Sequence, residues 1–500
     1  MREKLPEGWV ITNLENCVMI LDSYRKPVSF EERSKRIEGK PVESLFPYYG
    51  ATGKIGLIDD YLLEGRYVLI GEDGAPFFDF KNRIAYIVNG KIWVNNHAHV
   101  LLSDADNDYL CYFLNQFDFT GYVTGTTRLK LTQGKLRRIP VKFPPLNEQK
   151  RIVAKLDAIM PRIDSVKERL EKIPAILKRF RQSVLTAAVT GKLTEKWREE
   201  HPEVESAEEL LESIFKAKQA LCKQNVVSKL KIVDESDMFF STPVNWKWCR
   251  LSEITLKMST GPFGTMLHKS DYVDNGIPVI NPTNIVGEKI IASDKITISK
   301  SKYEELLRYS LKENNIVLAR RGDLSKCGIV RKEQSNWLCG TGSFFLEVAI
   351  SPVYFRLFYV SNYCQAPLNE DSIGSTMSNL NQSVLSNIAF PLPPLEEQKE
   401  IVRQVDKLFA LADKVEEHYQ EARARVDALA QSVLAKAFRG ELVPQDPSDE
   451  PAEKLLQRMR EEKAKMETEL KTASRSARGT GKNGAKTLRA GAEEKQASEP

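Results

Sequence analysis

A run of basic residues is the feature of the sequence that most directly suggests binding chemistry. Six cations and no acidic residue lie between positions 128 and 142: Arg128, Lys130, Lys135, Arg137, Arg138 and Lys142. Thr126 and Thr127 come directly before the run, and their amides and hydroxyl groups could donate to phosphate oxygens. A solvated basic surface would have the same composition. The run therefore predicts either a DNA contact or a surface without a ligand.

Two arginines and a lysine in the second half of the chain form another candidate group. Arg320 and Arg321 follow an apolar run that ends at Ala319, and Lys326 comes soon after them. This order predicts a strand followed by a turn, and an arginine on such a turn could donate two hydrogen bonds to one guanine. An ordinary surface turn has the same residue types, so both interpretations stay open.

A glycine-rich stretch from Gly50 to Lys54 has some likeness to a phosphate-binding loop. A Walker A loop needs a glycine and a hydroxyl residue at the positions that Tyr48 and Ile55 occupy, so nucleotide binding is not expected. The stretch predicts a turn from which Lys54 could reach a phosphate or a base edge.

Metal ligands are sparse in this sequence. His97 and His99 form a His-x-His pair without an evident third ligand, which favours a polar surface strand over a metal site. The seven cysteines include no Cys-x-x-Cys pair, so isolated thiols in a reducing compartment are favoured over a zinc site or disulfides. We expect neither a metal nor a cofactor.

Two Pro-Pro pairs are the only hint of a methyltransferase motif. Phe143 and Leu392 precede the pairs and a leucine follows each, whereas an amino-methyltransferase needs Asn or Asp before the prolines and an aromatic residue after them. The prolines are therefore interpreted as structural. No other catalytic motif is found, so the chain is predicted to be non-catalytic by itself.

An internal repeat shows which elements position these candidates. The segment 144–193 recurs at 393–442 with a constant shift of 249 and no gap, and 20 of its 50 positions are identical. Both copies begin with Pro-Pro-Leu-x-Glu-Gln-Lys, which holds the chain extended before an acidic first helical turn. The stretch that matches the first basic run, from Met377 to Pro391, has no charge, so the fold does not require a basic run there.

Apolar residues recur every three or four positions through both copies, which predicts two long helices that end near Gly191 and Gly440. A long apolar stripe must be covered, so we expect the two helices to pack as an antiparallel, coiled-coil-like pair. Pro161 and Pro174 predict a kink or break in the first helix. The predicted interface between the helices, or with partner subunits, comprises Leu156, Ile163, Leu170, Leu177, Val405, Phe409, Val415 and Val426.

The remainder of the chain has the glycine-punctuated β-branched and aromatic runs of mixed α/β domains. The predicted fold class is α+β, with two globular domains alternating with two long helices as a pseudo-twofold repeat. The predicted segments are a first globular domain (1–143), a first spacer helix (144–195), a charged linker (196–240), a second globular domain (241–392), a second spacer helix (393–446) and a charged, disordered tail (447–500). The two domains begin alike, at Trp9 and Trp246, but otherwise barely align.

Similar helices and dissimilar domains suggest a fixed spacer that carries two different DNA-binding ends. A helix of roughly 38–40 residues is about 55–60 Å long, or about one and a half turns of DNA. The pattern therefore predicts a bipartite target whose two half-sites differ in sequence.

The chain resembles the specificity subunits of type I restriction-modification systems. The resemblance rests on the Pro-Pro-Leu-x-Glu-Gln repeat, the Gln-Ser-Val-Leu and Gly-x-Leu helix ends, the tryptophan entry motif and the glycine stretches at 48–56 and 71–74. It implies two target recognition domains that each bind half of a split double-stranded DNA site. It also implies two modification (methyltransferase) subunits docked on the helices and restriction subunits in the larger assembly, with catalysis in those partners.

Alternative functions make different predictions. A coiled-coil scaffold that does not bind DNA is possible from the helices alone, but it leaves the first basic run unexplained. No stretch is apolar over the roughly 20 residues that a membrane span needs. With no apolar leader after Met1, the cytoplasm is the expected location.

Overall fold

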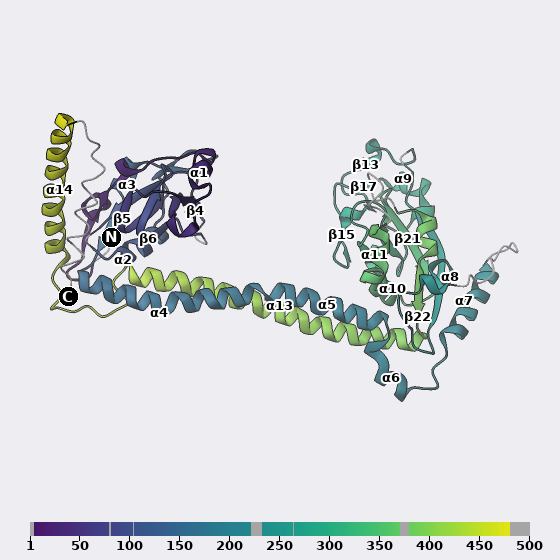
Figure 1. Cartoon of the computed structure of the whole chain (residues 1–500). Coiled ribbons are helices and arrows are strands. Elements are labelled where there is room, and N and C mark those ends of the chain that lie inside the picture. The colour runs from purple at the N-terminus through teal and green to yellow at the C-terminus, as the bar shows by residue number, and fades with distance from the viewer. Residues whose placement is uncertain are drawn as a thin grey trace. The chain divides into compact units, whose positions relative to one another are not determined.

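The computed structural model describes residues 5–79, 82–103, 105–221, 233–263, 265–370 and 380–480. The chain divides into two compact units (Figure 1). Unit 1 comprises residues 1–170 and 422–500, and unit 2 comprises residues 171–421. Each unit contains one globular domain together with parts of both spacer helices, and each is described by itself below.

The first globular domain is built on a six-stranded sheet with the strand order β2-β7-β5-β6-β3-β4. Helix α2 packs on strands β5 and β6 of this sheet. The elements of the domain are β1 (Val10–Asn13), β2 (Met19–Ile20), α1 (Phe30–Ile37), β3 (Phe46–Gly50), β4 (Gly53–Ile58), β5 (Leu63–Gly71), β6 (Ala85–Val94), β7 (Ala98–Leu102), α2 (Asn107–Gln116), β8 (Val123–Thr124), β9 (Lys130–Leu131), α3 (Gln133–Arg137) and β10 (Pro140–Phe143).

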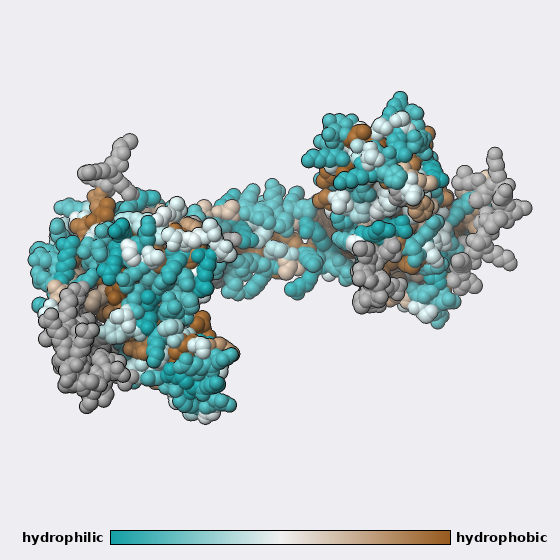
Figure 2. Space-filling view, turned by 90° about the horizontal axis from the view of Figure 1, so that it is seen from above, coloured by the Kyte–Doolittle hydropathy of each residue, from teal (hydrophilic) through white to brown (hydrophobic). Residues whose placement is uncertain are grey.

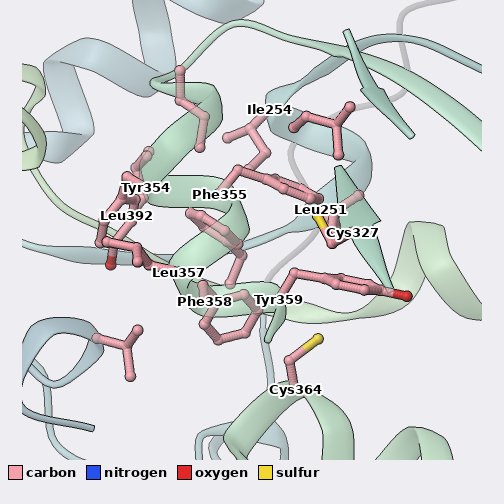
Figure 3. Packing of buried hydrophobic residues seen from close by; sticks show 14 of the residues in the cluster. Leu251, Ile254, Cys327, Tyr354, Phe355, Leu357, Phe358, Tyr359, Cys364 and Leu392 are labelled. Atoms are coloured by element: carbon pink, nitrogen blue, oxygen red, sulfur yellow. The ribbon is translucent and has the colours of Figure 1, made fainter. Parts of the chain in front are cut away.

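The second globular domain contains two four-stranded sheets, with the orders β12-β21-β18-β19 and β13-β17-β14-β20. Its elements are β11 (Lys247–Arg250), α8 (Leu251–Ile254), β12 (Thr255–Thr260), β13 (Tyr272–Val273), β14 (Ile277–Ile280), β15 (Ile285–Val286), β16 (Lys289–Ile290), β17 (Thr297–Ile298), α9 (Lys300–Glu305), β18 (Ile316–Ala319), β19 (Cys327–Ile329), β20 (Leu338–Cys339), β21 (Ser343–Val348), α10 (Pro352–Tyr359), α11 (Asn362–Glu370), α12 (Gln382–Asn387) and β22 (Ala389–Leu392). Aromatic residues of α10 fill its core, as Figure 3 shows for Phe355 and Phe358. Mixed helix and sheet in two repeated domains confirms the predicted fold class.

The spacer helices pack antiparallel. The first copy forms α4 (Leu146–Glu171) and α5 (Ile173–Val189), and the second forms one helix, α13 (Leu395–Ala437). In unit 1 Lys167 Nζ lies 2.8 Å from Asp427 Oδ1, and in unit 2 Arg181 Nη2 lies 2.6 Å from Asp413 Oδ1. Fourteen residues forward on the first helix correspond to fourteen residues back on the second, so both units have the same antiparallel register.

The prolines of the first copy have different effects. Pro161 lies inside α4, which continues past it, whereas Pro174 stands in the first turn of α5, directly after the break at Lys172. Proline is tolerated in a first turn because its missing N–H would have no helical partner there. The predicted break is therefore found at Pro174 and not at Pro161.

The buried stripe of the helices has a seven-residue spacing, as in coiled coils. Of the predicted interface residues, Leu156, Ile163, Leu177 and Val405 are buried, and Leu170, Phe409 and Val426 are half-buried. Val415 is 40% exposed, and Ala412 and Tyr419 are buried instead. The prediction for Val415 as a residue covered within this chain is wrong, because it lies off the stripe that runs through Val405, Ala412 and Tyr419.

A bond between tryptophan and glutamate joins each globular domain to the start of a spacer helix. Trp9 Nε1 donates to Glu148 Oε2 at 2.9 Å, and Trp246 Nε1 donates to Glu397 Oε2 at 2.8 Å. Both glutamates are buried, and burial raises the pKa of the Glu148 carboxyl. The glutamate of each repeated motif thus has a structural role. We call each bonded pair, Trp9 with Glu148 and Trp246 with Glu397, a helix joint.

The glutamine after each glutamate extends the helix joint into the domain. Gln149 Oε1 accepts from the amide of Asp106, and Gln398 Oε1 accepts from the amide of Ser351, both at 3.0 Å. Asp106 and Ser351 are the N-caps of α2 and α10, so the start of each spacer helix is tied to the start of a domain helix. The two domains therefore share more than their sequences suggest.

Each domain also receives the end of the other spacer helix copy. Gly191, after α5, packs against Pro243 at the entry to the second domain, and Gly440, after α13, packs against Pro6 at the entry to the first. Both glycines have a left-handed backbone, with φ of 77° and 74°. A Cβ atom would lie 2.5 Å from Pro243 Cγ or 2.4 Å from Pro6 Cγ, so only glycine fits.

Two further helices repeat in a way that the sequence analysis missed. Helix α7 (Ala207–Leu221) packs on the second domain and α14 (Ala452–Thr480) on the first, where Figure 1 shows it in yellow. Ala207 N donates to Asn245 O and Ala452 N donates to Gly8 O, each at 3.0 Å. The buried residues have the same spacing in both helices: Ala207, Leu210, Leu211 and Ile214, and Ala452, Leu455, Leu456 and Met459.

The predicted disordered tail is therefore wrong for residues 452–480, and residues 481–500 lie outside the described residues. Abundant charge suggested disorder, but four apolar residues at helical spacing are sufficient to dock α14 on the first domain. Among the described residues, none of the helices combines the length and apolar character that a membrane span requires.

Replacing Gly440 by alanine should destabilise unit 1 through both backbone strain and the clash with Pro6. Gly39 is a matched control, because it has a φ of 72° but no atom of the described residues lies within 4 Å of an added Cβ. We expect a loss of about 1 kcal/mol for Gly39→Ala and about 2–3 kcal/mol for Gly440→Ala, measured by urea unfolding. Equal losses would contradict the close packing of Gly440 and Pro6.

Candidate nucleic-acid interface

Three loops of the first domain meet at one end of its central sheet. Glu72, directly after β5, donates its amide to His97 O at 2.7 Å and accepts from the amide of Leu131 at 2.6 Å. Gly74 N donates to Leu129 O at 3.0 Å. Backbone bonds thus join the loops 71–74, 95–97 and 125–131, which we call the first loop cluster.

The first loop cluster contains several of the predicted DNA-binding residues. Arg128 pairs with Asp73, with Nη2 3.1 Å from Oδ1, and Lys130 pairs with Glu72, with Nζ 3.1 Å from Oε1. Thr126 and Thr127 are exposed in the same loop. The basic run lacks acids only along the sequence, because the fold brings two carboxylates from the loop after β5 against it.

Three other cations of the run lie on or next to α3, whereas Lys142 lies in β10. Lys135 Nζ donates to Gly121 O at 3.1 Å, and Arg137 lies 4.0 Å from a carboxylate oxygen of Glu15. Arg138 is exposed and forms no ion pair with any described residue. Of these three side chains, Arg138 is therefore the one whose charge no described group of the chain meets.

Lys54 is exposed at the start of β4, next to the turn between β3 and β4. This turn adjoins the first loop cluster, because a Cβ on Gly71 would lie 2.9 Å from Ala51 O. The Tyr86 hydroxyl donates to Gly50 O and fixes the turn. The glycine-rich stretch is thus a hairpin turn beside the cluster, as its composition predicted.

A network of buried charged side chains contacts the first loop cluster at Glu72 and Leu131. His99 is buried, so the predicted surface strand is wrong for this residue. Its Nδ1 lies 2.6 Å from Asp22 Oδ2 and its Nε2 lies 2.8 Å from Leu131 O. Both ring nitrogens of His99 thus lie within hydrogen-bonding distance of oxygen atoms. Arg25 Nη1 donates to Glu72 Oε2 at 2.6 Å.

The pKa values of the two acids in this network are lowered. Burial alone raises the pKa of the Asp22 carboxyl, but the hydrogen bond and charge of His99 and the charge of Arg25 outweigh it. The same holds for the pKa of Glu72, where Arg25, His99 and Lys130 outweigh burial. Ligand atoms of Asp22, Glu72 and His99 lie within 4.8 Å of one another, but these partners already account for the group as an ion-pair network.

The second domain has an equivalent loop cluster. Strand β5 pairs with β7 at Gly71 and Ala98, and β18 pairs with β21 at Ala319 and Ser343. Directly after these pairs, Arg320 N donates to Gly342 O and Leu380 N donates to Arg320 O, each at 2.9 Å. These bonds match those of Glu72 with His97 and Leu131. The loops around 320–322, 340–342 and 380 therefore form the second loop cluster.

The predicted residues of the second domain have unequal exposure. Arg320 is half-buried, with its guanidinium 5.9 Å from the centroid of the buried Phe344 ring, and its Nε has no hydrogen-bond partner among the described residues. Arg321 is exposed without an ion pair to any described residue. Lys326 Nζ donates to Pro282 O at 2.9 Å and is engaged within the domain. Of the stretch that matches the first basic run, residues 377–379 lie outside the described residues.

The visible surface of both units is largely polar. In Figure 2 most of the visible surface of each unit is teal, and brown apolar residues form only small, separate patches. A polar, cation-bearing surface suits a nucleic acid better than an apolar ligand.

Comparison with known proteins decides the class of this chain. Residues 6–175 and 243–422 both match the family model described as the type I restriction modification DNA specificity domain. The chain belongs to this family. The role of the specificity subunit is DNA sequence specificity in a type I restriction-modification system, and the two matches confirm both the predicted family and the internal repeat.

Individual relatives agree with this assignment. The specificity subunit is 31% identical to the EcoKI specificity subunit of Escherichia coli strain K12, over 92% of this chain and 97% of that protein. It is 29% identical to the EcoDI specificity subunit of Escherichia coli, over 84% and 89%. A chain in a solved structure concerning the complex assembly and conformational transition of a type I system has the same fold, with 19% identity, 88% and 100% coverage and a TM-score of 0.55.

Sequence reasoning missed the acids that meet the basic run. Glu72 and Asp73 stand within a glycine stretch that was noted only as a family mark, and nothing local to Arg128 or Lys130 indicates them. The signal that could have indicated these acids is their position. Glu72 and Asp73 directly follow strand β5, as Arg320 and Arg321 directly follow strand β18.

Replacing Arg25 by alanine should destabilise the first domain by about 3 kcal/mol at pH 7, because it leaves buried carboxylates short of a partner. Asp22 and Glu72 have lowered pKa values, so their contribution is present above about pH 4 and is lost as the pH falls further. The deficit of Arg25→Ala should therefore shrink in acid, which urea unfolding at several pH values would measure.

Arg66→Ala is the control for this experiment. The pair of Arg66 with Asp108 has side chains 51% and 32% exposed, so its loss should cost less than about 1 kcal/mol. If Arg25→Ala has as small an effect, the network does not stabilise the domain.

Proposed function

We propose that each globular domain of this specificity subunit binds one half of a bipartite, asymmetric double-stranded DNA target. The observation that supports this proposal most strongly is the equivalent position of the two loop clusters, which combine the same backbone bonds with different side chains. The same frame bearing different residues is suited to two half-sites of different sequence.

We assign the parts of the chain accordingly. Residues 1–143 and 241–392 are the target recognition domains, and residues 144–195 and 393–446 are the spacer helices. The spacer helices hold the half-sites apart, and α13 does so as one helix of 43 residues. The helix joints fix each domain to its spacer, so the loop clusters are presented from rigid elements.

The candidate DNA contacts fall into two classes. Thr126, Thr127, Lys130, Lys135 and Arg138 are suited to phosphates, which supply affinity without sequence information. Arg128 and Arg321 are exposed in the loop clusters and are suited to base edges in the major groove. Lys54 supports the first group from the adjoining turn. Arg137 and Lys326 are engaged within the protein, and Arg320 packs against the buried Phe344 ring.

We further propose that the spacer helices dock two modification subunits, with restriction subunits joining the larger assembly in the cytoplasm. Exposed apolar residues on the helices, including Val166, Ile176, Leu411, Val415 and Leu429, support such docking. Methyl transfer and cleavage belong to those partners, and this chain needs no cofactor of its own for binding. The relatives are named as specificity subunits of restriction enzymes, which is consistent with this division.

Sequencing of methylated bases in a host genome with and without this gene should reveal one methylated motif that depends on the gene. We expect two short specified segments of different sequence, separated by a fixed number of unspecified base pairs. Removal of the second domain should abolish specificity for one segment. A single uninterrupted motif would contradict the assignment of one half-site to each domain.

A further inference from the structure

The loop clusters present a cation at the same structural position by different means. After β18 the second position is Arg321 itself, whereas after β5 the equivalent position is Asp73. Asp73 is paired with Arg128, which comes from a different loop. In the second domain the arginine is thus at this position itself, whereas in the first domain an arginine from another segment is paired with the acid at this position.

Arg128 is unusually well fixed for an exposed side chain. It is 62% exposed, yet a Cβ on Gly74 would lie 3.4 Å from its Nε, so its guanidinium lies across the backbone of that glycine. Gly125 has a φ of 97°, and a Cβ there would lie 2.4 Å from Arg128 O. The turn that carries Arg128 is thus tight, and backbone hydrogen bonds join its loop, 125–131, to the loop 71–74.

Asp73 restrains Arg128 further and leaves donors free. Its Oδ1 accepts from Arg128 Nη2 at 3.1 Å and lies 2.5 Å from Nδ1 of His97, and its side chain is 20% exposed. Nη1 and Nε of Arg128 have no hydrogen-bond partner among the described residues. Nη2 carries two N–H groups, and Asp73 accepts from one of them. The other N–H group of Nη2, together with an N–H of Nη1 or Nε, forms the pair of parallel donors that match the O6 and N7 acceptors of guanine.

We propose that Asp73 is the positioning residue that orients Arg128 toward one guanine in the first half-site, and that Arg321 meets the second half-site from the equivalent position. This inference rests on the proposed function. The negative charge of Asp73 by itself repels DNA phosphates. In this proposal Asp73 nevertheless contributes to recognition, because it orients Arg128. Asp73 therefore lowers the affinity for DNA in general but raises the discrimination between guanine and other bases. An oriented arginine distinguishes guanine better than a mobile one.

The test uses the specificity subunit assembled with its modification subunits. Once the methylated motif is known, DNA is prepared with each base pair of one half-site substituted in turn while the other half-site is kept intact. Arg128→Ala should lower discrimination at one guanine of the first half-site by about 10-fold to 100-fold. Arg321→Ala should do so only in the other half-site.

Asp73→Ala should reduce discrimination at the same guanine as Arg128→Ala, while binding of unrelated DNA is unchanged or stronger. The double variant should lose no more discrimination than Arg128→Ala alone, because both changes remove one interaction. Asp73→Asn should retain part of the discrimination, since its amide oxygen still accepts from Arg128. Glu31→Gln, which removes an exposed acidic charge elsewhere in the domain, is the control for net charge and should leave discrimination unchanged.

Two outcomes would overturn this role. Either Asp73→Ala selects the first half-site as the unchanged protein does, or it loses discrimination equally at all positions together with a lower melting temperature. The second result would mean that Asp73 only stabilises the loop. If the unchanged assembly shows no preference in either half-site, the proposed function itself fails, so the two failures are distinguishable.

Discussion

The buried glutamate of each helix joint is the interaction on which the architecture depends. A carboxylate without water must find its hydrogen-bond donors within the protein, and Glu397 takes them from Trp246, Thr194 and Arg198. These donors come from the entry of a domain and from the segment after the opposite spacer helix. The joint is satisfied only when all three parts are in place, which fixes the domain to both helices.

The helix joints fix how each domain is attached, whereas the side chains of the loop clusters differ between the two domains. The bonds that hold the loops use backbone atoms, as in the pair of Leu131 with Glu72 and of Leu380 with Arg320, so they place no demand on the side chains. Acids and arginines can therefore occupy equivalent positions in one fold. In this chain the bonds that attach each domain to its helix are therefore separate from the loops whose side chains differ between the domains.

The loops after β5 and β18 have equivalent backbone hydrogen bonds, but different side chains support them in the two domains. His99, Glu72 and Arg25 satisfy one another in the first domain, whereas Arg320 stacks over Phe344 in the second. Ionic pairing and cation–π packing are exchangeable supports for a loop of the same shape. Sequence alignment of the domains fails here because the supporting chemistry differs while the backbone is shared.

The sequence by itself determined the repeat, the long helices, their antiparallel packing and the family, because these depend on local periodicity and on motifs that are contiguous in the chain. It also indicated Arg128, Arg320 and Arg321 as candidate contacts. Only the tertiary structure decided that Asp73 meets Arg128, that Lys326 is engaged internally and that α14 docks where a disordered tail was expected. Such contacts join residues far apart in the chain, and no local pattern encodes which distant partner a charge or an apolar stripe will meet.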